Sequence, residues 1–191
     1  MGSTAVTAHG KRYFPDGYFG TGYKLDDGCL TLDDFVPGKE SFSVALWLKT
    51  SGIVRDPSIF ANKDRRSAAN PGFYFSIRPH SLQLSFGWSE DDWNFEAPLP
   101  LDYTDGWMHI IVTVDRAANE AALYLDFKKV VSLQMHSALA DYDLTSLPFT
   151  IGQDGTREHP TQLSAVIDEF VLTKEVITQD IADAMKNFYN C

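Results

Sequence analysis

The sequence is poor in cysteine, lacks any long apolar run and carries few basic residues. Only two of its 191 residues are cysteines, Cys29 and Cys191. This count excludes a disulfide-stapled scaffold and a cysteine-rich zinc site. The two thiols could form a long-range disulfide that ties the C-terminus to the first strand. Alternatively, Cys29 is a buried free thiol and Cys191 lies in a frayed terminus.

No stretch approaches the ~18–20 consecutive apolar residues that a membrane-spanning helix needs. Residues 1–5 also lack the basic and apolar segments of a secretory signal. We therefore expect no membrane-spanning segment and no signal peptide in this chain.

Basic residues are outnumbered, with 16 Lys and Arg against 26 Asp and Glu, so the formal net charge is −10. A surface of this sign repels phosphates, which argues against a nucleic-acid partner. Many of the aspartates fall in turn-like segments, where their oxygens could coordinate a hard cation. The alternative is that the charge serves solubility alone.

Short apolar segments separated by turn residues dominate the chain, which is the pattern of an all-β sandwich. Residues 41–50 are apolar at both alternating sets of positions, so this strand should be central and covered on both faces. Residues 179–189 instead show helical spacing, with Thr178 placed to cap a short helix. The expected strands span residues 30–32, 41–50, 58–61, 72–78, 81–87, 108–115, 121–126, 129–133, 148–151 and 165–173.

Two polar loops stand out, residues 62–72 and 152–160. Each follows a short apolar strand-like segment, and each combines carboxylates, amides and turn-forming Gly or Pro. Binding residues are often carried by loops on a rigid scaffold, because such loops need not serve the core. If the two loops lie side by side, their oxygens could hold a hard cation or the hydroxyls of a sugar.

Several motifs, taken in order, resemble the laminin-G-like branch of the concanavalin A-like jelly rolls, from about residue 17 onward. The loop "NKD…NPGF" at residues 62–73, together with "IGQDG", is similar to one bacterial subgroup of that family. The motifs are GTGYKL at 20–25, FSVALWLK at 42–49, DGWMH at 105–109, LPFTIGQDG at 147–155 and IDEF at 167–170.

The resemblance implies a fold, a setting and a class of ligand. The fold would be an all-β, two-sheet antiparallel jelly-roll sandwich with a short C-terminal helix. Residues 17–191 would form the domain, and residues 1–16 an N-terminal extension. Such domains are usually non-catalytic, monomeric modules of larger extracellular or cell-surface proteins, often beside carbohydrate-active enzymes. Their ligands are glycans or proteins, and many carry calcium.

Two positions depart from the family pattern. Arg65 stands where the bacterial subgroup often has an aromatic residue, which weakens an aromatic stacking role for that loop. Phe127 stands where glycine is common, and this predicts a less relaxed turn because Phe tolerates positive φ poorly.

A calcium ion takes about six to eight oxygen ligands. No contiguous calcium-loop spacing occurs, so the ligands would have to converge from separate segments. The same residue types also stabilise turns without any metal. The candidate metal ligands are Asp64, Asp154, Asn62, Gln153 and Asp168.

A sugar site needs an aromatic face and a few polar groups. Trp93 and Trp88 lie in the acidic segment 87–95, which a core would not need, and are the candidate aromatic contacts. Trp47 and Trp107 belong to strand motifs and should be core residues. Arg65, Arg66, Arg157 and Asn70 complete the candidate ligand-binding set.

Catalysis finds little support in the sequence. The strand signature Glu-x-Asp-x-x-Glu of sandwich glycosidases is absent, and the adjacent Asp168 and Glu169 should point to opposite faces. The histidines show no lyase-like arrangement, and His109 should be a packed residue. We expect a non-catalytic, calcium-stabilised carbohydrate-binding module of a bacterial extracellular protein. The alternatives are a laminin-G-type domain that binds a protein, and an atypical glycoside hydrolase or lyase.

Overall fold

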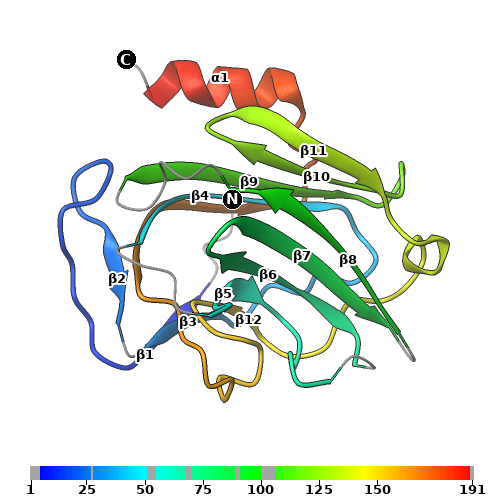
Figure 1. The fold of residues 1–191 in the computed structure, drawn as a ribbon, viewed down its shortest axis with the longest axis horizontal. Helices are drawn as coiled ribbons and strands as arrows, with labels where there is room; N and C mark the ends of the chain where they lie inside the picture. Colours follow the sequence, from blue (N-terminus) through cyan, green and yellow to red (C-terminus); the bar gives the residue numbers. More distant parts are fainter. Residues whose placement is uncertain are drawn as a thin grey trace.

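The computed structural model describes residues 5–26, 28–50, 55–67, 70–88, 91–99 and 106–189. Two antiparallel sheets stack face to face, and a helix lies on the outer side of one of them (Figure 1). This arrangement confirms the expected two-sheet sandwich with a short C-terminal helix.

We call the larger sheet the first sheet and the smaller one the second sheet. In spatial order the first sheet contains β1 (Val6–His9), β3 (Cys29–Leu32), β12 (Phe149–Ile151), β5 (Ser58–Ala61), β6 (Gly72–Arg78), β7 (Ser81–Trp88) and β8 (Asp91–Pro98). The second contains β11 (Lys128–Gln134), β10 (Glu120–Leu125), β9 (Trp107–Asp115), β4 (Phe42–Thr50), β13 (Ala165–Thr173) and β2 (Tyr23–Leu25).

The main core fills the space between the two sheets and is rich in phenylalanine. Phe60 of β5 stacks on Phe75 of β6 and on Phe149 of β12, with ring centroids 5.1 and 5.6 Å apart. All three rings are fully buried between the sheets. The rings cross-link strands that are distant in sequence, and they hold the ends of β5 and β12 in place.

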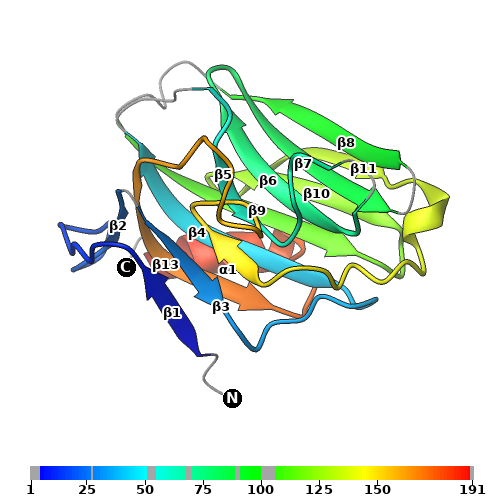
Figure 2. The ribbon, with the colours of Figure 1, turned by 90° about the horizontal axis from the view of Figure 1, so that it is seen from below.

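A second apolar cluster lies on the outer face of the second sheet, under α1 (Gln179–Tyr189). Val44 and Leu46 of β4 face the main core, whereas Ala45 and Trp47 face this cluster, so β4 is covered on both sides as predicted. Figure 2 shows α1 behind the second sheet. The hydroxyl of Thr178 accepts the N–H of Ile181 at 3.5 Å, which confirms the predicted cap.

The N-terminal segment contributes an edge strand. β1 pairs antiparallel with β3, in the register Val6 with Leu32 and His9 with Cys29. Part of the predicted extension, residues 1–16, therefore belongs to the first sheet, while the boundary at residue 17 stays a prediction. Cys29 is buried. Its possible partner Cys191 lies outside the described residues, so the disulfide also stays a prediction.

Two local features differ from ordinary strands and turns. The acidic segment 87–95, which the sequence analysis set apart from the core, is largely part of β7 and β8, which pair along their length. The β10–β11 turn places Asp126 at φ 47° and Phe127 at φ 68°. This confirms the strained turn predicted at Phe127, whose ring is buried in the second cluster and offsets the strain.

Candidate functional site

The two polar loops lie side by side, as the sequence predicted. The N–H of Gly155 donates to the carbonyl oxygen of Lys63 at 2.9 Å. The N–H of Arg65 donates to Oδ2 of Asp154 at 3.2 Å, across 89 residues of sequence. The hydrogen bonds between the loops show that their polar groups serve first to hold the loops together.

Asp154 and Gln153 are buried within this contact. Asp154 has an exposed fraction of 0%, and its Oδ1 accepts the hydroxyl of Thr156 at 2.8 Å. Oε1 of Gln153 accepts the N–H of Asp154 at 2.8 Å, and its Nε2 donates to the carbonyl of His159 at 2.8 Å. These side-chain oxygens satisfy donors that would otherwise be buried unpaired.

Asn62 has a similar structural part. Its Oδ1 accepts the N–H of Phe73 and its Nδ2 donates to the carbonyl of Leu144, both at 2.8 Å. A side chain added at Gly72 would lie 2.7 Å from that Oδ1, and Gly72 has φ 115°. Asn62 therefore links the start of β6 to the segment before β12 through two hydrogen bonds. Position 72 requires glycine, because any side chain there would clash with Asn62.

Asp64 and Asn70 shape the tip of the first loop. Oδ1 of Asp64 accepts the backbone N–H of Arg66 at 2.8 Å and its Nε at 3.2 Å. Burial raises the pKa of Asp64, but these hydrogen bonds and the charges of Arg66 and His159 outweigh it and lower the pKa overall. With its amide nitrogen turned toward the carbonyls of Asp64 and Ser67, Asn70 closes the loop.

Asp168 lies away from the two loops, on β13 of the second sheet. Its Oδ2 accepts the N–H of Phe19 and its Oδ1 the N–H of Glu169, both at 2.9 Å. Within the part of the chain that the structure describes, no group of three or more His, Cys, Asp or Glu side chains is placed to hold a metal ion. The candidate oxygens are committed to N–H and O–H donors, so a structural turn role accounts for them. Calcium stays a prediction.

The two candidate tryptophans belong to β7 and β8 of the first sheet, which pair beside Gly72 at the end of the first loop. Trp93 lies on β8, half-buried against the main core, with its ring 5.9 Å from Phe86 and 5.5 Å from Phe95. The alternation of Trp93, Phe95 and Ala97 was the signal for a strand. The side chain of Trp88 lies outside the described residues. A ligand contact for either tryptophan stays a prediction.

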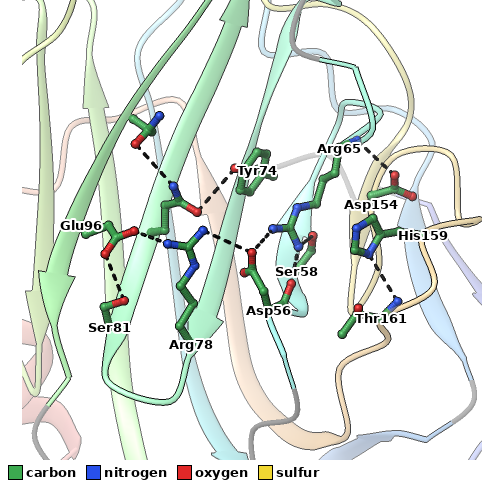
Figure 3. Close-up of polar contacts among 12 residues, drawn as sticks. Asp56, Ser58, Arg65, Tyr74, Arg78, Ser81, Glu96, Asp154, His159 and Thr161 are labelled. Carbon is green, nitrogen blue, oxygen red and sulfur yellow. Dashed lines mark hydrogen bonds and ion pairs between the residues drawn. The ribbon is translucent and has the colours of Figure 1, made fainter.

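Arg65 belongs to a polar network on the outer face of the first sheet (Figure 3). Its guanidinium lies 2.7 Å from Asp56 and packs over the ring of Tyr74, 4.2 Å from the centroid. Arg78 pairs with both Asp56 and Glu96. Arg65 thus supplies the cation in a cation–π contact with Tyr74. The carboxylates of Asp56 and Glu96 are each paired with an arginine.

A polar pocket of about 310 Å³ adjoins the second loop and brings Arg157 together with residues that the sequence did not suggest. Nη1 of Arg157 lies 3.0 and 3.2 Å from the two ring nitrogens of His9, which arrives on β1. Burial raises the pKa of the Cys29 thiol, which keeps it protonated at neutral pH. The lining residues are His9, Gly10, Gly28, Cys29, Thr156, Arg157, Glu158 and Gln162.

This pocket offers both hydrogen-bond donors and acceptors. Arg157 donates only, Glu158 accepts only, and the side chains of Gln162 and Thr156 can do both. Arg157 has φ 64°, a conformation that non-glycine residues rarely adopt. Of the predicted ligand-binding residues, Arg157 is the one that lines this pocket. Arg66, which pairs with Glu158 at 3.4 Å, stands beside it.

Residues 22–181 match a laminin G family described as "Concanavalin A-like lectin/glucanases superfamily". No curated protein matches the chain significantly. No helix in the described part is long and apolar enough to cross a membrane.

Among solved structures, the binding domain of botulinum neurotoxin serotype D/C is similar, with a TM-score of 0.73 and 15% identity over 97% of this chain and 47% of that one. A complex of the botulinum neurotoxin DC binding domain with rat synaptotagmin II has a TM-score of 0.74 and 14% identity, with the same coverage of 97% and 47%. A botulinum neurotoxin type C structure, from work on cell entry that depends on two ganglioside molecules, has a TM-score of 0.71 and 14% identity over 98% and 46%. The chain therefore spans about half the length of these neighbours, and the likeness concerns the fold.

Proposed function

Because the chain belongs to the laminin-G-like family of the concanavalin A-like lectin and glucanase superfamily, we propose that it is a non-catalytic carbohydrate-binding module. We place it in a larger extracellular or cell-surface protein, as is usual for the family. The proposal does not require calcium, which is a separate prediction with its own test.

The observation that carries the proposal is the pocket around Arg157. Its volume of about 310 Å³ accommodates a monosaccharide or the end of an oligosaccharide. Sugar hydroxyls both donate and accept hydrogen bonds, and the mixture of Arg157, Glu158, Gln162 and Thr156 matches that need. Arg157 could also form a bidentate contact with the carboxylate of an acidic sugar.

The structural neighbours support the proposal at the level of the fold only. One is a binding domain solved in complex with rat synaptotagmin II, and another is a neurotoxin whose cell entry depends on interaction with two ganglioside molecules. Their identity to this chain is 14%, so no residue role is transferred from them.

The described carboxylates support a non-catalytic function. Asp56 and Glu96 share Arg78, and Asp154 and Asp168 accept backbone N–H groups. A glycosidase needs one carboxyl group that holds a proton and a second that faces the same sugar. These four carboxylates are instead occupied by arginine or backbone N–H donors, which leaves them poorly placed to reach a sugar.

The direct test is a glycan array followed by calorimetry with the best ligand. Asn tolerates positive φ, so Arg157→Asn removes the guanidinium without straining the backbone. We expect this variant to weaken binding by about tenfold or more, the value of a lost charged hydrogen bond. Lys186→Ala, which removes one exposed positive charge from α1, is the matched control and should bind as the parent chain does. Equal binding by the parent and Arg157→Asn would remove this pocket from the site.

A further inference from the structure

The segment that leads into β2 forms a hairpin, residues 13–24, which we call the aromatic hairpin. The N–H of Gly17 donates to the carbonyl of Gly20 at 3.0 Å, which places residues 18 and 19 at its tip. A side chain added at Gly17 would lie 2.4 Å from Oδ2 of Asp168. The tip of the aromatic hairpin therefore lies close against β13 of the second sheet.

Tyr18, at this tip, covers Trp47 of β4. The two rings are nearly parallel, with centroids 3.5 Å apart and planes 7° apart. Tyr18 is 37% exposed, so it is accessible to solvent while it shields the indole from it. A pyranose can pack its apolar face on an indole in the same parallel manner. Tyr18 thus occupies the place that a sugar ring would take on Trp47.

Trp47 lies between two polar side chains in a row across the sheet. It pairs directly with Asp168 of β13 on one side and with His109 of β9 on the other. Directly paired residues of neighbouring antiparallel strands carry their side chains on the same face, about 4.5–5.5 Å apart. The row therefore presents a carboxylate, an indole and an imidazole side by side.

Three polar atoms of this row are buried without a partner. Nε1 of Trp47 and both ring nitrogens of His109 have no hydrogen bond to any described residue, at exposed fractions of 5% and 0%. The carboxylate of Asp168, in contrast, accepts the N–H of Phe19 from the hairpin tip at 2.9 Å. Because buried polar groups are normally paired, the three atoms point to a ligand that can satisfy them.

A neutral sugar matches the chemistry of this row. Its hydroxyl oxygens can accept the indole N–H, its hydroxyl groups can donate to the carboxylate of Asp168, and its ring can stack on Trp47. Asp168, the charged side chain of the row, is negative and would repel the carboxylate of an acidic sugar. The Arg157 pocket has the opposite preference.

We propose that the row of Asp168, Trp47 and His109 is a second binding site, for a neutral glycan, and that the tip of the aromatic hairpin closes it until a glycan displaces Tyr18. The proposal rests on the carbohydrate-binding function proposed above. It uses none of the residues that line the Arg157 pocket, so each site can be tested without the other.

The closed tip sets the affinity of this site. Opening it would break the hydrogen bond from Phe19 to Asp168, the stacking of Tyr18 on Trp47 and the stacking of Phe19 on Tyr189. A site that is open only part of the time binds more weakly in proportion to its open fraction, so a tip that is open about one-tenth of the time lowers the apparent affinity about tenfold.

The probe is cellotetraose, a neutral β-linked glucan, titrated into the ¹⁵N-labelled Arg157→Asn chain so that the first pocket lacks its guanidinium. Adding Tyr18→Ala opens the second site, and this double variant should bind cellotetraose about tenfold more tightly. Binding should shift the indole N–H signal of Trp47, which Trp47→Phe assigns, and the amide signals of residues 107–110 and 167–169.

Two further variants serve as controls, each in the same Arg157→Asn background. Tyr13→Ala removes another exposed aromatic residue of the hairpin, one whose ring packs with Lys24, and it should produce no gain in affinity. Tyr18→Phe keeps a ring that can stack on Trp47, so it should also show no gain. The amide spectra report directly whether each variant is folded.

Two results would overturn the proposal. One is a folded Tyr18→Ala variant that binds cellotetraose no more tightly than Arg157→Asn alone, and the other is a gain in affinity that leaves the indole signal of Trp47 unmoved. If a glycan still binds the parent chain and not Arg157→Asn, the first pocket stands while the second site falls. If neither the parent chain nor Tyr18→Ala binds any glycan on the array, both proposals fall.

Discussion

The imidazole of His109 lies flat against the ring of Phe127, with centroids 4.0 Å apart and planes 18° apart. His109 is fully buried, and neither of its ring nitrogens has a hydrogen-bond partner among the described residues. Burial lowers its pKa from 6.5 to about 4. The ring is therefore a neutral packing element beneath α1, and protonating it is costly.

This burial predicts that the fold is sensitive to mild acid. The unfolded chain binds a proton at His109 below its ordinary pKa of 6.5, whereas the folded chain does so only near pH 4. The free energy of unfolding should therefore fall as the pH drops from 6.5 to 4, by up to about 1.4 kcal/mol per pH unit. Urea unfolding across this range measures the slope.

The controls are two histidine variants. His109→Phe should lose most of the slope, because Phe packs in the same place and cannot titrate. His80→Gln changes an exposed histidine and should keep it. If His109→Phe has the same pH dependence as the parent chain, then another group causes it.

Asp154 should matter for stability through the donors that it satisfies. Asp154→Ala removes the acceptor of two partly buried donors, the N–H of Arg65 and the hydroxyl of Thr156. Unfolding in urea should show a loss of about 1–3 kcal/mol, because an unsatisfied buried donor costs about that much and water can reach these two in part. Asp154→Asn retains one oxygen and should lose less. Equal losses for the two variants would mean that the hydrogen bonds are not the cause.

Chelation tests calcium separately. The sequence predicts a calcium site, so millimolar calcium should raise Tm above its value in EGTA, whereas an unchanged Tm would leave the candidate oxygens with their turn role alone. A calcium-dependent rise of several degrees would support the metal site predicted at Asp64 and Asp154. In that case, Asp64→Asn and Asp154→Asn should each reduce the rise.

Phe127 combines a strained backbone with a buried ring. Phe127→Gly relieves an αL strain of about 1–2 kcal/mol but removes aromatic burial worth about 3–5 kcal/mol. The net result should be a loss of about 1–4 kcal/mol in urea unfolding. Arg55→Gly relaxes an exposed residue at φ 66° and should change stability by no more than about 1 kcal/mol. A stabilised Phe127→Gly variant would show that the strain outweighs the packing.

The sequence predicted those elements whose signals are local. Thr178 and the helical spacing after it predicted α1, and doubled apolar alternation predicted the two covered faces of β4. β8 was missed because the acidic residues around 90–92 obscured the alternation of Trp93, Phe95 and Ala97. β1 was missed because its four residues, Val6–His9, are too few to show a clear alternation of apolar and polar side chains.

The candidate site was harder to predict because it depends on contacts that are distant in sequence. The residue type of Arg157 and its polar loop suggested a ligand role. Its neighbour His9 is 148 residues away, and no local pattern joins them. The buried hydrogen bonds of Asn62 and Asp154 were equally hidden, since a polar residue in a loop looks the same whether it binds a ligand or another loop.

The edge position of β1 affects how the Arg157 pocket would respond to a bound ligand. His9 reaches the pocket from an edge strand held on one side only, whereas Arg157 and Glu158 lie on the loop that follows β12, an interior strand of the same sheet. A ligand that touches both sides would clamp the strand in place. Thermodynamic linkage then requires that binding and strand docking strengthen each other by the same free energy. Ligand binding would therefore stabilise the docked form of β1, and amide hydrogen exchange along this strand would slow as the ligand binds.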